Sequence, residues 1–232
     1  MTRPQAVLFD FSGTLFRFEA RDEWFAELHD ADGNALHLDT QAELIRRMTQ
    51  PVGIPAALAD EDRIAWEQRD LDPAQHRKAY LSMLRASGLS VADHAEQLYA
   101  RVLDPHSWRI FDDTCAVLKG VRAAGIRVGV VSNIAFDLRE VLALHGIEDL
   151  VEQYALSYEV GAIKPNPEIF HAALDPLGIE PAAALMVGDS EHADGGARAI
   201  GCDFALVHDV PPAQRSTALI DAVRARGVDL SR

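Results

Sequence analysis

Short apolar runs, each followed by polar residues, recur near the start of the chain and through its second half. Residues 6–9 (AVLF) and 184–187 (ALMV) are continuously apolar, and residues 127–131 and 204–207 are rich in valine and other strand-forming residues. Runs of this length and composition predict strands buried on both faces, as in a parallel sheet. Residues 154–158 are a further candidate for a short strand.

Helical spacing of apolar residues separates these predicted strands. Such stripes occur at residues 117–124, 134–145, 193–200 and 217–226. Asn166 is placed to cap another helix, which has Pro167 at its first position. Because strands alternate with helices, the fold class we predict is α/β, with a doubly wound, mostly parallel sheet.

The segment from residue 16 to about residue 110 interrupts this alternation, and its pattern predicts helices throughout. Helical spacing with mixed charges runs through residues 41–48, 61–68, 74–86 and 91–102. An insertion of nearly a hundred residues is far too long for a loop in a compact domain. We therefore expect an all-helical domain over residues 16–110, inserted into an α/β core of residues 1–15 and 111–232. Since ligands of open α/β sheets bind at the carboxyl ends of strands, a domain inserted after the first strand is placed to act as a lid.

Composition and charge narrow the classes of partner. The chain has 232 residues, 48% of them hydrophobic, and a net charge of −14, so we expect no binding to nucleic acid or to anionic membranes. No apolar run approaches the roughly 18 residues that span a bilayer, and residues 1–5 show no secretory signal. Cys115 and Cys202 lack metal-ligand spacing, so we expect a reduced, cytoplasmic protein. The oligomeric state is left open.

Three predicted strands end in a polar residue that can carry chemistry. Asp10, Ser132 and Asp189 each follow an apolar run, and the carboxyl ends of parallel strands meet at one edge of the sheet. Polar residues at such ends also make turns and cap helices, so each residue alone has both interpretations. Their combination with Lys164 shifts the balance towards a functional site. Lysine otherwise occurs only at positions 78 and 119, so an argument that needs a lysine has few candidates.

Four motifs in this chain resemble those of the haloacid dehalogenase (HAD) superfamily of hydrolases. Residues 10–15 (DFSGTL) resemble the first motif and residues 130–133 (VVSN) the second. Residues 159–170, which contain Lys164-Pro165, resemble the third, and residues 187–201, with Asp189 and Asp194, resemble the fourth. The resemblance implies a HAD-like, Rossmann-type core, with a helical cap domain inserted between motifs one and two.

The resemblance also implies a nucleophile and a metal site. Asp10 would attack phosphorus and form an aspartyl phosphate, while Lys164 and Mg²⁺ would offset the repulsion between two anions. By resemblance the Mg²⁺ ligands would be the Asp10 carboxylate, the Ser12 backbone carbonyl and Asp189.

Further residues would bind the phosphoryl group or support the site. Ser132 would donate a hydrogen bond to a phosphoryl oxygen, and backbone N–H groups near Gly13 and Asn133 would complete the cradle. Thr14 would support the turn, and Asp194 would orient Lys164 or water at the metal. The phosphate-binding set that we expect is Ser12, Gly13, Ser132, Asn133 and Lys164.

Ser12 departs from the family pattern, because HAD phosphatases usually carry a second Asp at this position. That Asp protonates the leaving group and activates water, and losing such a group costs about 10²- to 10⁴-fold in rate. We therefore predict a Mg²⁺-dependent phosphohydrolase of a small phosphorylated molecule that is slow or suited to good leaving groups.

Two alternatives stay open. One is a catalytically weak or inactive HAD-fold protein that binds or regulates. The other is a HAD enzyme that cleaves a C–halogen or C–P bond, the latter with Lys78 as a Schiff base. Asp189 and Asp194 argue against the dehalogenase, because dehalogenases of this family lack the metal-type fourth motif.

Overall fold

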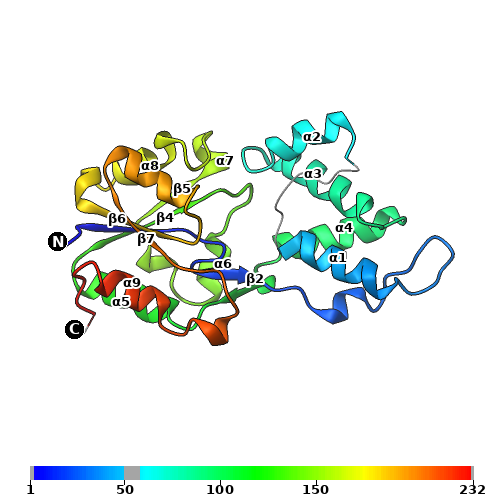
Figure 1. Cartoon of the computed structure of the whole chain (residues 1–232), viewed down its shortest axis with the longest axis horizontal. Helices are drawn as coiled ribbons and strands as arrows, with labels where there is room; N and C mark the ends of the chain where they lie inside the picture. The colour runs from blue at the N-terminus through cyan, green and yellow to red at the C-terminus, as the bar shows by residue number, and fades with distance from the viewer. Residues whose placement is uncertain (1–2, 50–57, 231–232) are drawn as a thin grey trace. The chain divides into compact units, whose positions relative to one another are not determined.

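The structure is a computed structural model that describes residues 3–49 and 58–230. The chain forms two compact units. The core unit comprises Met1–Arg17 and Arg109–Arg232, and the helical unit comprises Phe18–Trp108. Both units are drawn in Figure 1.

A five-stranded parallel sheet organises the core unit. Its strand order is β5-β4-β1-β6-β7, so β1 lies in the middle and pairs with both β4 and β6. This position explains why β1 consists of four apolar residues that are all fully buried. The predicted parallel α/β sheet is thereby confirmed. The strands are β1 (Ala6–Phe9), β4 (Arg127–Ser132), β5 (Gln153–Leu156), β6 (Ala184–Gly188) and β7 (Asp203–Leu206).

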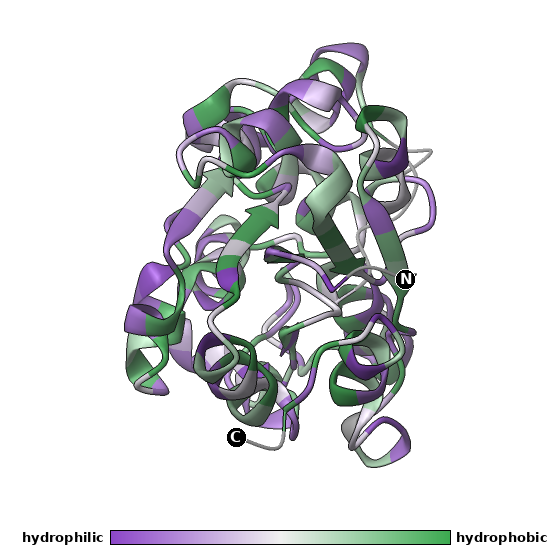
Figure 2. Ribbon diagram, turned by 90° about the vertical axis from the view of Figure 1, so that its left-hand side faces the viewer, coloured by the Kyte–Doolittle hydropathy of each residue, from purple (hydrophilic) through white to green (hydrophobic). Residues whose placement is uncertain are grey.

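Helices cover both faces of this sheet. α5 (Thr114–Ala123) and α9 (Ala218–Arg224) pack together on one face, and α8 (Pro167–Leu174) and the 3-10 helix η5 (Asp194–Ile200) pack together on the other (Figure 1). Figure 2 shows that hydrophobic residues gather on the central strands, while hydrophilic residues lie mostly on helices and loops. Shorter elements complete the unit: α6 (Arg139–Leu144), α7 (Ser157–Val160), η3 (Glu148–Leu150), η4 (Pro181–Ala183) and η6 (Pro212–Gln214).

The helical unit contains four α-helices among its described residues, and their positions agree with the predicted stripes to within a few residues. α3 contacts the other three helices and buries its apolar side against them. The helices are α1 (Leu38–Thr49), α2 (Asp60–Glu67), α3 (Pro73–Ala86) and α4 (Ala92–Leu103), with 3-10 helices η1 (Asp22–Phe25) and η2 (Pro105–Ser107).

Two helices, one in each unit, begin in the same way. Asp72 caps α3 and Asn166 caps α8, and each cap is followed by a proline at the first helical position. The cap predicted at Asn166 is thereby confirmed.

The structure corrects three local predictions. The segment 16–110 is not helical throughout, because β2 (Phe16–Phe18) pairs with β3 (Trp108–Ile110). Both segments alternate apolar residues with arginine, which is the period of a strand. The strand predicted at 154–158 ends at Leu156, where α7 follows. The helix predicted at 193–200 is a 3-10 helix that contains Gly195 and Gly196, residues that weaken an α-helix.

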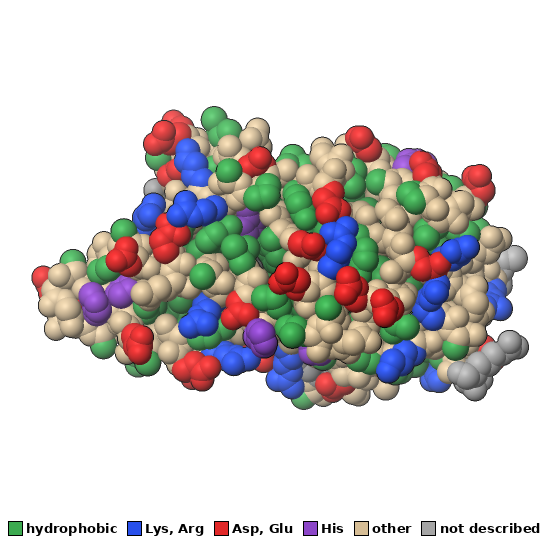
Figure 3. Space-filling view, turned by 180° about the vertical axis from the view of Figure 1, so that it is seen from behind, with side chains coloured by type: hydrophobic (Ala, Val, Ile, Leu, Met, Phe, Trp, Pro, Cys, Tyr) green, Lys and Arg blue, Asp and Glu red, His purple; other side chains and the backbone are tan. Residues whose placement is uncertain are grey.

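Charges of both signs are mixed on the surface. On the face drawn in Figure 3, acidic and basic side chains lie interspersed, and hydrophobic groups are scattered between them. Within residues 3–49 and 58–230, no helix combines the length and the apolar character needed to cross a membrane.

Candidate active site

The polar residues predicted at the strand ends lie at one edge of the core sheet. Asp10 follows β1, Ser132 ends β4 and Asp189 follows β6. Since β1 runs between β4 and β6, the carboxyl ends of these strands are neighbours. Ser132 is buried at this edge, with 2% of its surface exposed. The sheet order therefore places the three residues around one site.

Lys164 hydrogen-bonds several buried groups at this edge of the sheet and forms a cluster with them. Its Nζ donates to Asp10 Oδ1 at 2.6 Å, to Asp194 Oδ1 at 2.7 Å and to the Val131 carbonyl at 2.9 Å. Only 4% of the residue is exposed, and these bonds use all three donors of an ammonium group. Burial by itself lowers the pKa of Lys164, but the carboxylates of Asp10 and Asp194 outweigh it and raise the pKa above its ordinary value.

The carboxylates of the cluster are too many for one lysine. Burial raises the pKa of Asp10 to about 6, and Lys164 offsets part of this effect. Burial, together with the charges of Asp10 and Asp194, raises the pKa of Asp189 to about 8. Three carboxylates beside one ammonium leave an excess of negative charge, so an additional cation would stabilise the ionised cluster.

The oxygen atoms of this cluster suit a divalent cation. Asp10, Asp189 and Asp194 offer carboxylate oxygens that all lie within 4.8 Å of one another. Asp10 Oδ2 is buried and accepts no hydrogen bond from the described residues. Asp194 uses both oxygens already, one for Lys164 and one for the N–H of Ser190 at 2.9 Å. Carboxylates are ligands that Mg²⁺ prefers, and Asp10 and Asp189 are better placed than Asp194 to hold it.

Gly13 shapes the loop beside Asp189. Its φ is +82°, and an added Cβ would lie 2.3 Å from Asp189 Oδ2, so only glycine fits. The Gly13 N–H donates to the Phe16 carbonyl at 2.7 Å. Thr14 is fully buried in the same turn, and Ser12 is exposed.

Asn133 holds the backbone of Lys164, a role that the sequence analysis missed. Its Oδ1 accepts from the Lys164 N–H at 2.7 Å, and its Nδ2 donates to the Lys164 carbonyl at 3.2 Å. We expected only the backbone N–H of Asn133 to contribute. The signal was the presence of an amide side chain at a strand end, but its partner lies 31 residues away and no local pattern identifies it.

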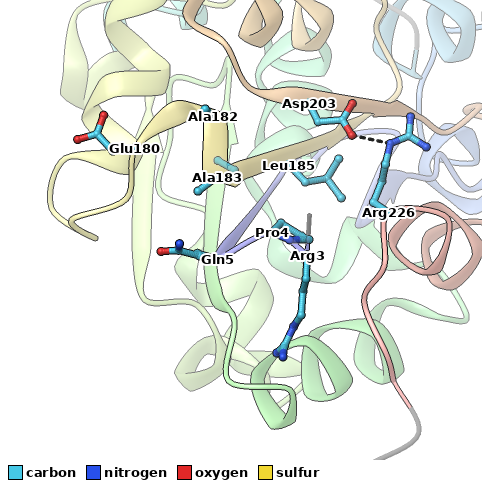
Figure 4. A pocket seen from close by; sticks show the side chains of 10 residues that line it. Arg3, Pro4, Gln5, Glu180, Ala182, Ala183, Leu185, Asp203 and Arg226 are labelled. Atoms are coloured by element: carbon cyan, nitrogen blue, oxygen red, sulfur yellow. Dashed lines mark ion pairs between the residues drawn. The ribbon is translucent and has the colours of Figure 1, made fainter. Parts of the chain in front are cut away.

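A separate cavity lies at the opposite, amino-terminal end of the sheet. It has a volume of about 330 Å³ and opens beside the starts of β1, β6 and β7 (Figure 4). Among its lining residues, Arg226 pairs with Asp203, with 2.7 Å between Nε and Oδ2. None of the clustered carboxylates lines this cavity, so it is not the site described above.

Known proteins match this chain in sequence. The family model of haloacid dehalogenase-like hydrolases matches residues 4–201. The haloacid dehalogenase-like hydrolase domain-containing protein 3 of Bos taurus is 37% identical over 124 residues, which cover 53% of this chain and 49% of that protein. The chain spans about half the length of the curated relatives of this kind. Glyceraldehyde 3-phosphate phosphatase of Methanopyrus kandleri is 28% identical over 194 residues, covering 80% of this chain and 75% of that protein.

Solved structures share the fold. A HAD hydrolase of Bacillus subtilis, YfnB, crystallised with magnesium, has a TM-score of 0.65 at 18% identity and covers 89% of each chain. A HAD phosphatase of Thermococcus onnurineus has a TM-score of 0.52 at 24% identity, covering 88% of this chain and 86% of that one. Identities this low show the fold alone. With the family model matching residues 4–201, the chain belongs to the haloacid dehalogenase-like hydrolase family.

Proposed function

We propose that this chain is a Mg²⁺-dependent phosphohydrolase that cleaves a small phosphorylated molecule through an aspartyl phosphate on Asp10. The observation that carries the proposal is the Asp10 carboxylate held 2.6 Å from Lys164, in one cluster with Asp189 and Asp194. A glyceraldehyde 3-phosphate phosphatase among the relatives aligns with 80% of the chain and supports this class of reaction.

The cluster meets the electrostatic demand of the reaction. A carboxylate nucleophile and a phosphoryl group are both negative, so their approach needs positive charge between them. Lys164 supplies one cation from a fixed position. Mg²⁺, held by Asp10, Asp189 and the Ser12 carbonyl, would neutralise further charge and polarise the phosphoryl group. Asp194 keeps Lys164 in place, because its Oδ1 accepts from Nζ and its Oδ2 is tied to the backbone of Ser190.

The proposed chemistry has two steps. An oxygen of Asp10 attacks phosphorus, the bond from phosphorus to the leaving oxygen breaks, and an aspartyl phosphate forms. Water then attacks the same phosphorus, which releases inorganic phosphate and restores the Asp10 carboxylate. Ser132 would donate a hydrogen bond to a phosphoryl oxygen through both steps. The sum is ester plus water to alcohol plus phosphate.

Asp10→Asn tests the proposal most directly. We expect it to lower turnover of p-nitrophenyl phosphate with Mg²⁺ by at least about 10³-fold, because the nucleophile is lost. Asp112→Asn is a matched control at an exposed position outside the cluster. A screen of phosphorylated metabolites, haloacids and phosphonates beside these variants identifies the bond that is cleaved.

Because Ser12 replaces the usual second Asp, we expect a low rate of phosphate-ester hydrolysis. The substitution Ser12→Asp, which restores the carboxyl group, tests this expectation. We expect Ser12→Asp to raise turnover of an aryl phosphate by about tenfold, since a carboxyl group can protonate the leaving oxygen and activate water. Ser12→Asn, of similar size but without an acid, is the control. An unchanged or lower rate for Ser12→Asp would contradict this account of Ser12.

The alternatives make different predictions. A binding protein turns over no phosphate ester, and Asp10→Asn leaves its function intact. A C–P bond-cleaving enzyme needs an uncharged lysine, whereas the side chain of Lys78 is 47% exposed, with Nζ 3.7 Å from Asp62 Oδ1. An exposed, ion-paired ammonium is a poor Schiff-base nucleophile.

A further inference from the structure

Arg215 reaches from the segment after β7 to the loop that follows Asp10. Its Nη1 donates to the Gly13 carbonyl at 2.5 Å, and its Nη2 donates to the Thr14 carbonyl at 2.9 Å. Nη1 also donates to the His208 carbonyl at 3.2 Å. Only 5% of the residue is exposed. One buried guanidinium therefore joins two loops at the active-site edge of the sheet.

Phe111, in the chain segment before α5, packs its ring against the Arg215 guanidinium. The Arg215 guanidinium carbon lies 3.8 Å from the centroid of the Phe111 ring, a distance typical of a cation–π contact. The Phe111 N–H donates to the Leu15 carbonyl at 3.2 Å, and Thr114 Oγ1 donates to the same carbonyl at 2.9 Å. Three successive carbonyls of the loop, at residues 13–15, are thus held by groups that are distant in sequence.

The chemical identity of Arg215 matters for this arrangement. A planar guanidinium offers two parallel donors in fixed geometry, which suits two neighbouring carbonyls, whereas a lysine ammonium acts as a single point. Burial lowers the pKa of Arg215, and the nearby carboxylates of Asp113, Asp209 and Asp189 oppose that effect. The Arg215 side chain therefore holds the two loop carbonyls and also places a positive charge near these three carboxylates.

Gly13 lies between Arg215 and Asp189. Its carbonyl accepts from the guanidinium, while its Cα approaches Asp189 so closely that an added Cβ would lie 2.3 Å from Oδ2. A rotation of this loop would move Asp10 and the Ser12 carbonyl relative to Asp189. Misplacing reactive groups by about 1 Å can lower a rate by 10²-fold.

We propose that Arg215 is a positioning residue of the active site, which fixes the loop of Asp10 against Asp189 by holding the Gly13 and Thr14 carbonyls. It thereby sets the affinity for Mg²⁺ and the rate of turnover. The part concerning turnover rests on the function proposed above, and the part concerning Mg²⁺ has a separate readout.

The test compares Arg215→Met and Arg215→Lys with the matched control Arg226→Met. Arg226 also donates to a backbone carbonyl, that of Phe204 at 3.1 Å, and pairs with Asp203, but it lies at the opposite end of the sheet (Figure 4). For the full chain, one measures the Mg²⁺ concentration that gives half of the maximal rise in Tm. Well below Tm, one measures kcat and KM for p-nitrophenyl phosphate.

We expect Arg215→Met to raise the half-saturating Mg²⁺ concentration by about tenfold and to lower kcat by about tenfold or more, with KM less affected. Arg215→Lys should recover only part of the Mg²⁺ affinity and of kcat, because it restores the positive charge without the two parallel donors of the guanidinium group. Arg226→Met should lower Tm alone. If Arg215→Met lowers Tm but leaves Mg²⁺ affinity and kcat at wild-type values, its role is structural and the proposal is overturned.

The two proposals fail in different ways. Wild-type protein that shows a Mg²⁺-dependent rise in Tm but no turnover of any phosphate ester removes the proposed function, and Arg215 is then judged by Mg²⁺ affinity alone. Wild-type protein without any response to Mg²⁺ overturns both proposals. Should Arg215→Met not fold, Arg215→Lys decides by the same two readouts.

Discussion

The core unit and the helical unit bury different kinds of polar side chain. The buried polar groups of the core unit include five Asp, Lys or Arg residues, whereas those described in the helical unit are His76, His94 and Ser107. The helical unit also buries the aromatic rings of Tyr80 and Tyr99. The five residues of the core unit are Asp10, Asp113, Lys164, Asp194 and Arg215.

The two units therefore differ in whether their buried polar side chains carry a charge. Removing ions from water costs several kcal/mol for each ion, so buried charges are found where they are paired or used. In the core unit, three of the five form one hydrogen-bonded cluster: Asp10, Lys164 and Asp194. Two buried groups of the helical unit are held neutral near pH 7, because burial lowers the pKa of His76 to about 4 and raises the pKa of Tyr99 to about 12. No Asp, Glu, Lys or Arg side chain is buried among the described residues of the helical unit.

Of the substitutions that test this difference between the units, Lys164→Met should have the largest effect on stability. Loss of the ammonium leaves the buried carboxylates of Asp10 and Asp194 without their cation, and we expect it to lower the free energy of unfolding by about 3–5 kcal/mol. Urea unfolding followed by far-UV circular dichroism measures both units. Tryptophan fluorescence reports the helical unit, since Trp24, Trp66 and Trp108 all lie there.

Lys119→Met is the control for this measurement. Lys119 lies on α5 and is exposed, so its loss should change stability by no more than about 0.5 kcal/mol. Equal effects of the two substitutions would show that the buried cluster contributes nothing to the stability of the core unit.

Acidification should affect the helical unit through His76. Its pKa is about 4 in the folded unit against an ordinary value of 6.5, so between these values the unfolded state binds more protons. Stability is therefore complete above pH 6.5 and is lost as pH falls towards 4, by up to about 3 kcal/mol. Urea unfolding at several pH values, followed by tryptophan fluorescence, measures this loss.

His76→Gln isolates this contribution. Glutamine does not titrate and can hydrogen-bond Tyr99, whose hydroxyl lies 3.0 Å from His76 Nδ1. Relative to His76→Gln, wild type should lose stability steadily as pH falls from 6.5 to 4. Parallel pH profiles for the two proteins would remove His76 as the cause.

The smallest expected effect concerns the two cap–proline helix starts, one in each unit. Asp72 accepts from two backbone N–H groups at 2.8 and 2.9 Å, while Asn166 accepts from one at 3.0 Å. We expect Asp72→Ala to cost about 1–2 kcal/mol and Asn166→Ala about 0.5–1 kcal/mol. Fluorescence-detected unfolding should register the first substitution. A loss for Asn166→Ala as large as that for Asp72→Ala would show that neither the second bond nor the charge of Asp72 matters.

Local patterns predicted most elements, and they went wrong where two patterns compete. Residues 16–18 and 108–110 adjoin helical sequence, yet their two-residue alternation makes them strands β2 and β3. Residues 193–200 have a helical stripe, but Gly195 and Gly196 accompany a 3-10 helix. Elements with long, regular stripes, such as α3 and α4, were predicted almost to the residue because packing and propensity agree there.

The sequence by itself determined the parallel sheet and the polar residues at the carboxyl ends of its strands, because strand-length apolar runs end in Asp10, Ser132 and Asp189. Only the tertiary structure decided how these residues are held. The Asn133 side chain hydrogen-bonds the Lys164 backbone, and Arg215 donates to the Gly13 carbonyl, 202 residues away in sequence. The physical reason is that local periodicity fixes the type of an element, whereas partners between loops depend on strand order, here β4-β1-β6, and on side chains that leave no periodic trace.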